Sequence, residues 1–178
     1  MSAARRYVPV FAAAGVVVLL DRLSKNWAVA ELHDKGRVVD VALGVQFRFA
    51  QNQGMAFSKF ANSGTVIGLI AVAIVVGLVW FARTVPSLWA RIIIGVVIGG
   101  ALGNLIDRMT RLPAPGNPSG FLKGAVVDFI YTSWWPTFNV ADAAVVVGGI
   151  ALAIVAWRMP EEPVPEEPVP VDPESTAT

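Results

Sequence analysis

The sequence predicts an all-α polytopic membrane protein with four transmembrane helices and a small extracytoplasmic β-sheet between helices one and two. Hydrophobic residues make up 55% of the 178 positions and the mean hydropathy is +0.61, which is too apolar for a soluble domain of this size. Four apolar runs approach or exceed the roughly 20 residues that span the hydrocarbon core of a bilayer. Strand-forming residues after the first run predict the sheet.

We expect the helices at about 7–30, 64–82, 88–109 and 137–157. The first apolar stretch and the later Ala28-Val29-Ala30 resemble a cleavable signal peptide, but Asp21, Arg22 and Lys25 interrupt that pattern. We therefore expect the first helix to be retained. The second run contains no charged residue, which is typical of a membrane span.

Two segments should lie outside the membrane on the same side, at about 31–63 and 110–136. In the first, residues 38–43 and 45–49 favour strands and are separated by Gly44, which predicts a small sheet resting on the membrane surface. The second begins with a Pro- and Gly-rich stretch over 112–124, which predicts a loop. Its later half is aromatic and apolar, as is typical of a membrane interface.

The charges are unevenly distributed along the chain. Residues 161–178 hold six of the thirteen acidic residues and no basic one, and their repeated Glu-Glu-Pro-Val-Pro cannot bury a core. We therefore predict one domain over residues 1–160 and a disordered, acidic, Pro-rich cytoplasmic tail over 161–178. The domain carries 14 basic and seven acidic residues, a balance that suits anionic lipid. We expect no nucleic-acid partner, because no basic and aromatic cluster is present.

The residue types that are missing exclude several kinds of site. The chain has no cysteine, so it can form no disulfide, thiolate nucleophile, iron–sulfur cluster or cysteine-based zinc site. His33 is the one histidine, which argues against bis-histidine haem and against a Ser-His-Asp triad.

Arg5 and Arg6 precede the first helix and favour a cytoplasmic N-terminus, which with four spans places both termini in the cytoplasm. Seven basic residues nevertheless lie in or beside the two outer segments, so counting alone does not decide the orientation. Our expectation follows the first helix.

Glycines recur every four residues on the third helix, at Gly95, Gly99 and Gly103, and Gly64 and Gly68 repeat this spacing on the second. Small residues at this spacing allow two helix backbones to approach closely. We interpret both series as packing faces.

Polar residues in and beside the apolar runs cluster at the outer ends of the helices. They are Asp21, Lys25, Asn104, Asp107, Arg108, Asp128, Asn139 and Asp142. Asp21 and Lys25 are four residues apart, so they share a helix face and can pair. Two further pairs are three residues apart on their own helices. If the helices alternate in direction, all of these groups meet at one membrane face.

Asp128 and Asp142 are the strongest candidates for chemistry. An ionised carboxylate beside an apolar run is costly and therefore usually functional. Two neighbouring carboxyl groups can lower that cost by sharing one proton, which is the working arrangement of an aspartic protease. The structural alternative is a pair of helix-end charges near water.

The other polar residues have structural explanations as well. Asp21 and Lys25 could form a pair that only makes a long helix tolerable in the membrane. Asp107 and Arg108 are expected to orient their neighbours, because arginine cannot act as a base at neutral pH. Asn139 could simply cap the fourth helix.

Five motifs occur in an order that resembles a known family. They are Asp21-x-x-x-Lys25, Asn52-Gln53-Gly54-Met55-Ala56-Phe57, the segment from Gly99 to Arg108, Val126-Val127-Asp128-Phe129 and Phe138-Asn139-Val140-Ala141-Asp142. Together, over residues 15–157, they resemble the bacterial lipoprotein signal peptidases, also called signal peptidase II. One departure is the stretch 112–124, which looks longer than the usual link of the family.

The resemblance implies an aspartic endopeptidase that removes the signal peptide from diacylglyceryl-modified prolipoproteins, just before the lipidated cysteine. Asp128 and Asp142 would be its catalytic dyad and would activate water without a metal or an organic cofactor. The residues that would bind substrate or brace the dyad are Asp21, Lys25, Asn52, Gly54, Asn104, Asp107, Arg108 and Asn139. We expect a monomer in the bacterial cytoplasmic (inner) membrane, surrounded by membrane lipid, with its active site near the extracytoplasmic face.

Two other classes of function fit parts of the pattern. Intramembrane acids also mark ion paths, so the polar residues could form a proton or cation relay in a small transporter. A relay needs polar groups at the midplane and beyond, however, and the second helix offers none. A non-catalytic assembly subunit would use the glycine faces but would leave the two aspartates without a purpose.

Overall fold

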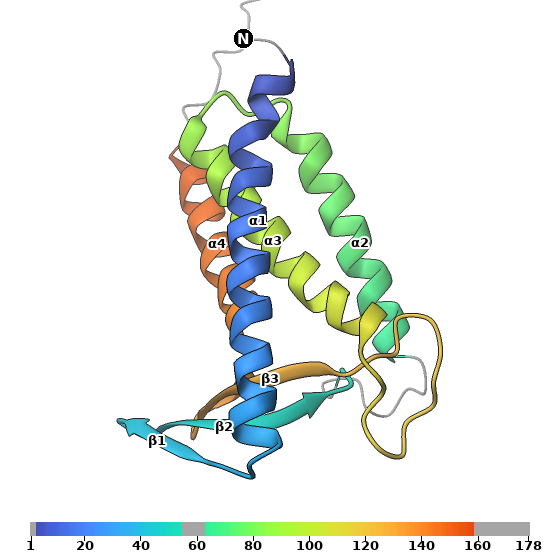
Figure 1. The fold of residues 1–178 in the computed structure, drawn as a ribbon. Coiled ribbons are helices and arrows are strands. Elements are labelled where there is room, and N and C mark those ends of the chain that lie inside the picture. The colour runs from blue at the N-terminus through green and yellow to red at the C-terminus, as the bar shows by residue number, and fades with distance from the viewer. Residues whose placement is uncertain (1–2, 55–62, 159–178) are drawn as a thin grey trace, which may run out of the picture.

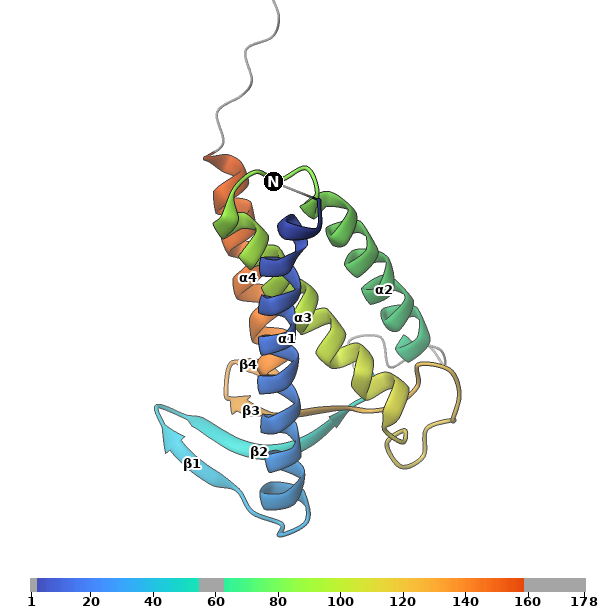
Figure 2. The ribbon, with the colours of Figure 1, turned by 45° about the horizontal axis from the view of Figure 1, so that its top comes forward.

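The computed structural model describes residues 3–54 and 63–158, and in these residues four helices form a bundle with a sheet across one end (Figure 1). The segments that form the sheet lie at one end of the bundle, which we call the sheet end. The start of the first helix and the end of the last helix lie together at the opposite end (Figure 2). The expected disordered tail, 161–178, and Met55-Ala56-Phe57 of the second motif lie outside the described residues.

The helices are α1 (Ala3–Ala28), α2 (Ser63–Ala82), α3 (Leu88–Thr110) and α4 (Val140–Trp157). All four are long and apolar enough to cross a membrane, which confirms the prediction of four spans. A single π-helical turn, η1 (Val29–His33), extends α1 beyond the bundle. The fourth helix begins later than expected because Thr137 and Phe138 belong to a strand.

The sheet has four antiparallel strands in the order β1-β2-β3-β4. They are β1 (Val39–Ala42), β2 (Val45–Asn52), β3 (Val126–Thr132) and β4 (Trp135–Phe138). The first two form the sheet predicted between helices one and two. The other two come from the segment between α3 and α4, for which the sequence predicted a membrane interface and no strand. Strands β2 and β3 pair and join the two hairpins into one sheet, with Ala50 opposite Asp128. This pairing places Asp128 at the sheet end of the bundle.

The sheet is attached to α1 by aromatic side chains. The Trp27 ring lies edge-on to Phe47 of β2 and to Phe129 of β3, with ring centroids 5.6 and 6.1 Å apart. Edge-to-face pairs at this distance are a favoured aromatic geometry. Ala28, Leu32 and Val127 complete this small core, which fixes the position of β3 relative to the helices.

Helix α3 is the central helix and contacts each of the other three. A methyl group added at Gly99 would lie 2.7 Å from the Ala14 carbonyl oxygen of α1, and one added at Gly103 would lie 2.6 Å from an Asp21 carboxylate oxygen. The series on α3 is therefore a packing face, as expected. Gly64 and Gly68 instead face Leu122 of the loop before β3.

We predict that Gly99→Ala lowers the melting temperature of the purified protein in detergent. The new methyl group would push α1 away from α3, and overpacking of this kind costs about 1–3 kcal/mol. The matched control is Gly77→Ala on α2, where an added methyl group meets no atom within 4 Å. A melting temperature for Gly99→Ala that equals the control would contradict close packing of α1 on α3.

Candidate active site

Asp128 lies in the middle of β3, with only 2% of its surface exposed. Its two carboxylate oxygens each accept a side-chain hydrogen bond: Oδ1 from Asn139 Nδ2 at 2.7 Å, and Oδ2 from Asn52 Nδ2 at 2.9 Å. These partners come from the entrance of α4 and the end of β2. Sheet pairing and the α4 cap therefore fix this carboxyl group from both sides.

Asp142 lies in the first turn of α4 and is held there by a reciprocal cap. The Asn139 side chain accepts a hydrogen bond from the Asp142 backbone N–H at 3.0 Å, and Asp142 Oδ2 accepts one from the Asn139 backbone N–H at 3.1 Å. Such a capping box satisfies two of the backbone donors that a helix start leaves open. Asn139 thus caps the helix, as the structural explanation held, and also bonds Asp128.

The environment of Asp128 favours its protonated form. Burial raises the pKa of Asp128 to about 7, and the nearby Asp142 carboxylate adds to the rise, while the hydrogen bonds from Asn52 and Asn139 oppose it. Two neighbouring carboxyl groups whose environments differ in this way can hold one proton near neutral pH.

Asn104 links this pair of acids to a buried ion cluster. Its Nδ2 donates to Asp142 Oδ1 at 2.7 Å, and its Oδ1 accepts from Lys25 Nζ at 2.9 Å and from Asn139 Nδ2 at 3.1 Å. Both polar atoms of the amide are therefore occupied. Asn104 therefore connects Lys25 on α1 to the Asp142 carboxylate on α4 through two hydrogen bonds.

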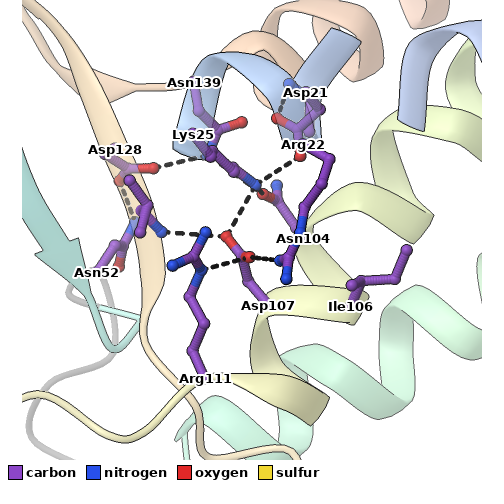
Figure 3. Close-up of polar contacts among 12 residues, drawn as sticks. Asp21, Arg22, Lys25, Asn52, Asn104, Ile106, Asp107, Arg111, Asp128 and Asn139 are labelled. Carbon is purple, nitrogen blue, oxygen red and sulfur yellow. Dashed lines mark hydrogen bonds and ion pairs between the residues drawn. The ribbon is translucent and has the colours of Figure 1, made fainter. Parts of the chain in front are cut away.

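Lys25 is fully buried and lies between two carboxylates, as Figure 3 shows. Its Nζ is 2.8 Å from Asp21 Oδ2 and 3.1 Å from Asp107 Oδ2. The pairing of Asp21 with Lys25, expected from their spacing, is present. Asp21 also accepts a hydrogen bond from the Ala141 backbone N–H of α4 at 3.0 Å, so the cluster joins α1, α3 and α4.

Asp107 forms ion pairs with three basic side chains. Besides Lys25, its carboxylate contacts Arg22 Nη1 at 3.2 Å and Arg111 Nε at 2.6 Å (Figure 3). Its Oδ2 also accepts a hydrogen bond from the Val127 backbone N–H, one residue before Asp128. Asp107 therefore positions β3 against α3.

Arg22 and Arg111 are the cluster members that the sequence pattern did not indicate. Arg111 lies four residues after Asp107, the same spacing that identified Asp21 and Lys25, so its pairing could have been found in this way. Arg22 comes from another helix, and its contact depends on how α1 and α3 pack.

A cleft opens beside these residues, and we call it the α2 groove. It has a volume of about 380 Å³ and lies between α2, α3 and α4. Its polar end is formed by Asn52, Gly54, Asn104, Arg108 and Asp142. Its apolar wall on α2 consists of Ile67, Ile70, Ala71 and Ile74, which share one helix face. The groove therefore offers polar contacts beside the acids and an apolar surface deeper in the bundle.

Arg108, at the polar end of the α2 groove, has a side-chain nitrogen without a hydrogen-bond partner among the described residues. The residue is 6% exposed, and the nitrogen is Nη1. A buried donor left in this state is costly unless a bound molecule accepts from it.

Gly54 is buried with a φ of 93°, a conformation that favours glycine, and its N–H donates to Asn52 Oδ1 at 2.7 Å. That bond orients the amide that contacts Asp128.

The depth of the polar residues argues against an ion relay. Among the described residues, the buried charged groups other than Arg91 all belong to the sheet end of the bundle. Arg91 lies at the opposite end, where its Nη2 donates to the Pro86 carbonyl oxygen at 2.8 Å. The described part of the chain therefore has no continuous row of buried charges across the membrane.

Comparison with known proteins identifies the family. Residues 13–158 match the family described as signal peptidase (SPase) II. The lipoprotein signal peptidase of Rhodococcus jostii (strain RHA1) is 40% identical over 151 residues, which cover 85% of this chain and 73% of that protein. That of Mycobacterium tuberculosis (strain H37Rv) is 40% identical over 152 residues, covering 85% of this chain and 72% of that protein.

Among solved structures, a bacterial membrane enzyme determined by the in meso method at 1.9 Å resolution has a similar fold. It is 27% identical, the TM-score is 0.68, and the match covers 85% of this chain and 94% of that one. The family match covers most of the chain, including both aspartates and every other residue of the candidate site. The chain therefore belongs to the lipoprotein signal peptidase (signal peptidase II) family of aspartic peptidases.

Proposed function

We propose that Asp128 and Asp142 are the catalytic dyad with which this signal peptidase II cleaves diacylglyceryl-modified prolipoproteins just before the lipidated cysteine. The observation that carries the proposal is the pairing of a buried carboxyl group, whose pKa is raised to about 7, with a second carboxylate held at a helix start. The two groups are bridged by Asn139, so their relative position is fixed before substrate binds.

The two acids have environments that suit different roles. Asp142 lies in the first turn of α4, where its carboxylate is held as a hydrogen-bond acceptor by the backbone N–H of Asn139. It therefore acts as the base. Asp128 is buried and keeps its proton to higher pH, so it acts as the acid.

The reaction then proceeds in two steps. In the first, Asp142 takes a proton from water, the hydroxyl oxygen bonds to the scissile carbonyl carbon, and Asp128 gives its proton to the carbonyl oxygen. In the second, the carbon–nitrogen bond breaks, Asp142 passes its proton to the leaving amine, and Asp128 recovers a proton from the intermediate. The enzyme returns to its starting protonation state.

Arg108 supplies a hydrogen-bond donor for the substrate. The residue lines the α2 groove beside Asp142, and its Nη1 has no acceptor among the described residues. A peptide carbonyl in the groove would accept from it. Asn52 and Gly54 line the same end of the groove, where their polar atoms orient Asp128.

The ion cluster acts as the brace of the dyad. Lys25 holds Asn104, which donates to Asp142, while Asp107 holds the β3 backbone beside Asp128. Asp21 holds Lys25 and the start of α4. These groups touch the dyad or its supports, so we assign them positioning roles.

The chain is a multi-pass protein of the bacterial membrane, and we propose an orientation for it. Arg5 and Arg6 favour a cytoplasmic N-terminus, and the start of α1 and the end of α4 share one end of the bundle (Figure 2). Both termini then lie in the cytoplasm, and the sheet and dyad lie at the extracytoplasmic face. We further propose that residues 1–160 act as a single monomeric peptidase domain.

We predict that Asp128→Asn and Asp142→Asn each lower the cleavage rate by at least about 10²-fold, the typical contribution of a general acid or base. Cleavage of a diacylglyceryl-modified prolipoprotein by purified, detergent-solubilised protein measures the effect. Asp40→Asn is the matched control, because Asp40 is an exposed acid in the same sheet and should keep wild-type activity.

Size-exclusion profiles and melting curves must show that both dyad variants are folded. Wild-type activity in either folded variant would remove that residue from the dyad.

We predict that kcat/KM falls about tenfold per pH unit above pH 7. The pKa of Asp128 is raised to about 7, so the acid is protonated below that pH and loses its proton above it. The measurement is kcat/KM as a function of pH at constant detergent concentration and constant ionic strength. A rate that continues to rise to pH 9 would contradict a protonated Asp128 in the active form.

A further inference from the structure

A second groove reaches the dyad from the other side of α4, and we call it the tryptophan groove. It has a volume of about 350 Å³ and lies between the β3–β4 hairpin and α4. Its lining residues are Thr132, Trp134, Trp135, Phe138, Asp142, Ala143, Val146 and Val147. Asp142 and Val146 line the α2 groove as well, so both grooves end at the same carboxylate.

The tryptophan groove opens toward the bilayer. Val146 and Val147 are 51% and 66% exposed on a helix that crosses the membrane, so they face lipid. Trp134 and Trp135 are also exposed; Trp134 lies in the β3–β4 turn, and Trp135 is the first residue of β4, the strand that leads into α4. Tryptophan is enriched at this depth because its ring is apolar and its N–H can meet a polar group of the interface.

The two grooves differ in the contacts that they offer. At its polar end the α2 groove has the Arg108 guanidinium, whose Nη1 has no acceptor among the described residues and can donate to a peptide carbonyl group. The tryptophan groove has Asp142 as its one ionisable lining residue among those described, and otherwise offers apolar surface, indole N–H groups and one hydroxyl. Such a surface matches a hydrocarbon chain whose ester carbonyl accepts from an indole.

We propose that the tryptophan groove binds an acyl chain of the substrate's diacylglyceryl group, while the α2 groove receives the peptide. This inference rests on the proposed function. The lipid is attached to the cysteine that follows the scissile bond, so its chains must leave the dyad within a few bonds. A groove that starts at Asp142 and opens into the bilayer provides that path without moving the chain through the bundle.

The test compares two prolipoprotein peptides that differ only in the length of their acyl chains. Val147→Phe should fill the tryptophan groove and lower the long-chain to short-chain ratio of kcat/KM about tenfold, because burying two methylene groups already contributes a factor of that size. Ile150→Phe is the matched control, since Ile150 is 58% exposed on the same helix and lines neither groove. Its ratio should equal that of the wild type.

A second variant separates the two grooves. Ala71→Phe narrows the α2 groove and should lower kcat/KM for both peptides without changing their ratio. An unchanged ratio in Val147→Phe, including an equal loss for both peptides, would overturn the inference, because the groove would then bind peptide or nothing. A wild-type ratio close to one would overturn it as well. Failure of the proposed function is distinguishable, since the wild-type protein would then cleave neither peptide.

Discussion

The cost of burying three aspartates, with a fourth (Asp142) half-buried beside them, at one end of an apolar bundle is the constraint on which the rest of the structure depends. Asp21 and Asp107 are stabilised by Lys25, which is itself fully buried between them. Removing one partner from such a buried pair typically costs about 3–5 kcal/mol, because the other charge is left uncompensated. Asp128 lowers its cost by a different route, because burial and the neighbouring Asp142 carboxylate raise its pKa to about 7 and it keeps its proton to that pH.

The same constraint explains why elements far apart in the sequence meet at this end. A buried carboxylate needs a donor for each oxygen, and the donors here come from different elements: Asn52 from β2, Asn139 from the start of α4, and the Val127 backbone N–H from β3. The sheet is therefore part of the site as well as its cover. The glycines of α3 allow α1 and α4 to pack closely against it. At this distance Lys25 of α1 donates a hydrogen bond to Asn104, and Asn104 donates one to Asp142 of α4.

Local patterns in the sequence were sufficient for the parts of the fold that depend on one helix or one hairpin. The four apolar runs predicted the spans, and the four-residue spacing of Asp21 and Lys25 predicted their pair. Strands β3 and β4 were missed because β3 is buried on both faces at its start, so it has no alternation to recognise, and the aromatic residues of β4 resemble a membrane interface. The contact of Arg22 with Asp107 depends on helix packing, which no local pattern encodes.

An infrared titration of the carboxyl groups in the wild-type protein and in Asp128→Asn tests directly whether Asp128 and Asp142 share a proton. We predict a protonated carboxyl band near neutral pH that disappears in the wild type with a midpoint of about pH 7 and is absent from Asp128→Asn. The Asp40→Asn variant should retain this band. A wild-type spectrum in which no such band titrates between pH 5 and 9 would contradict a proton shared by the two acids.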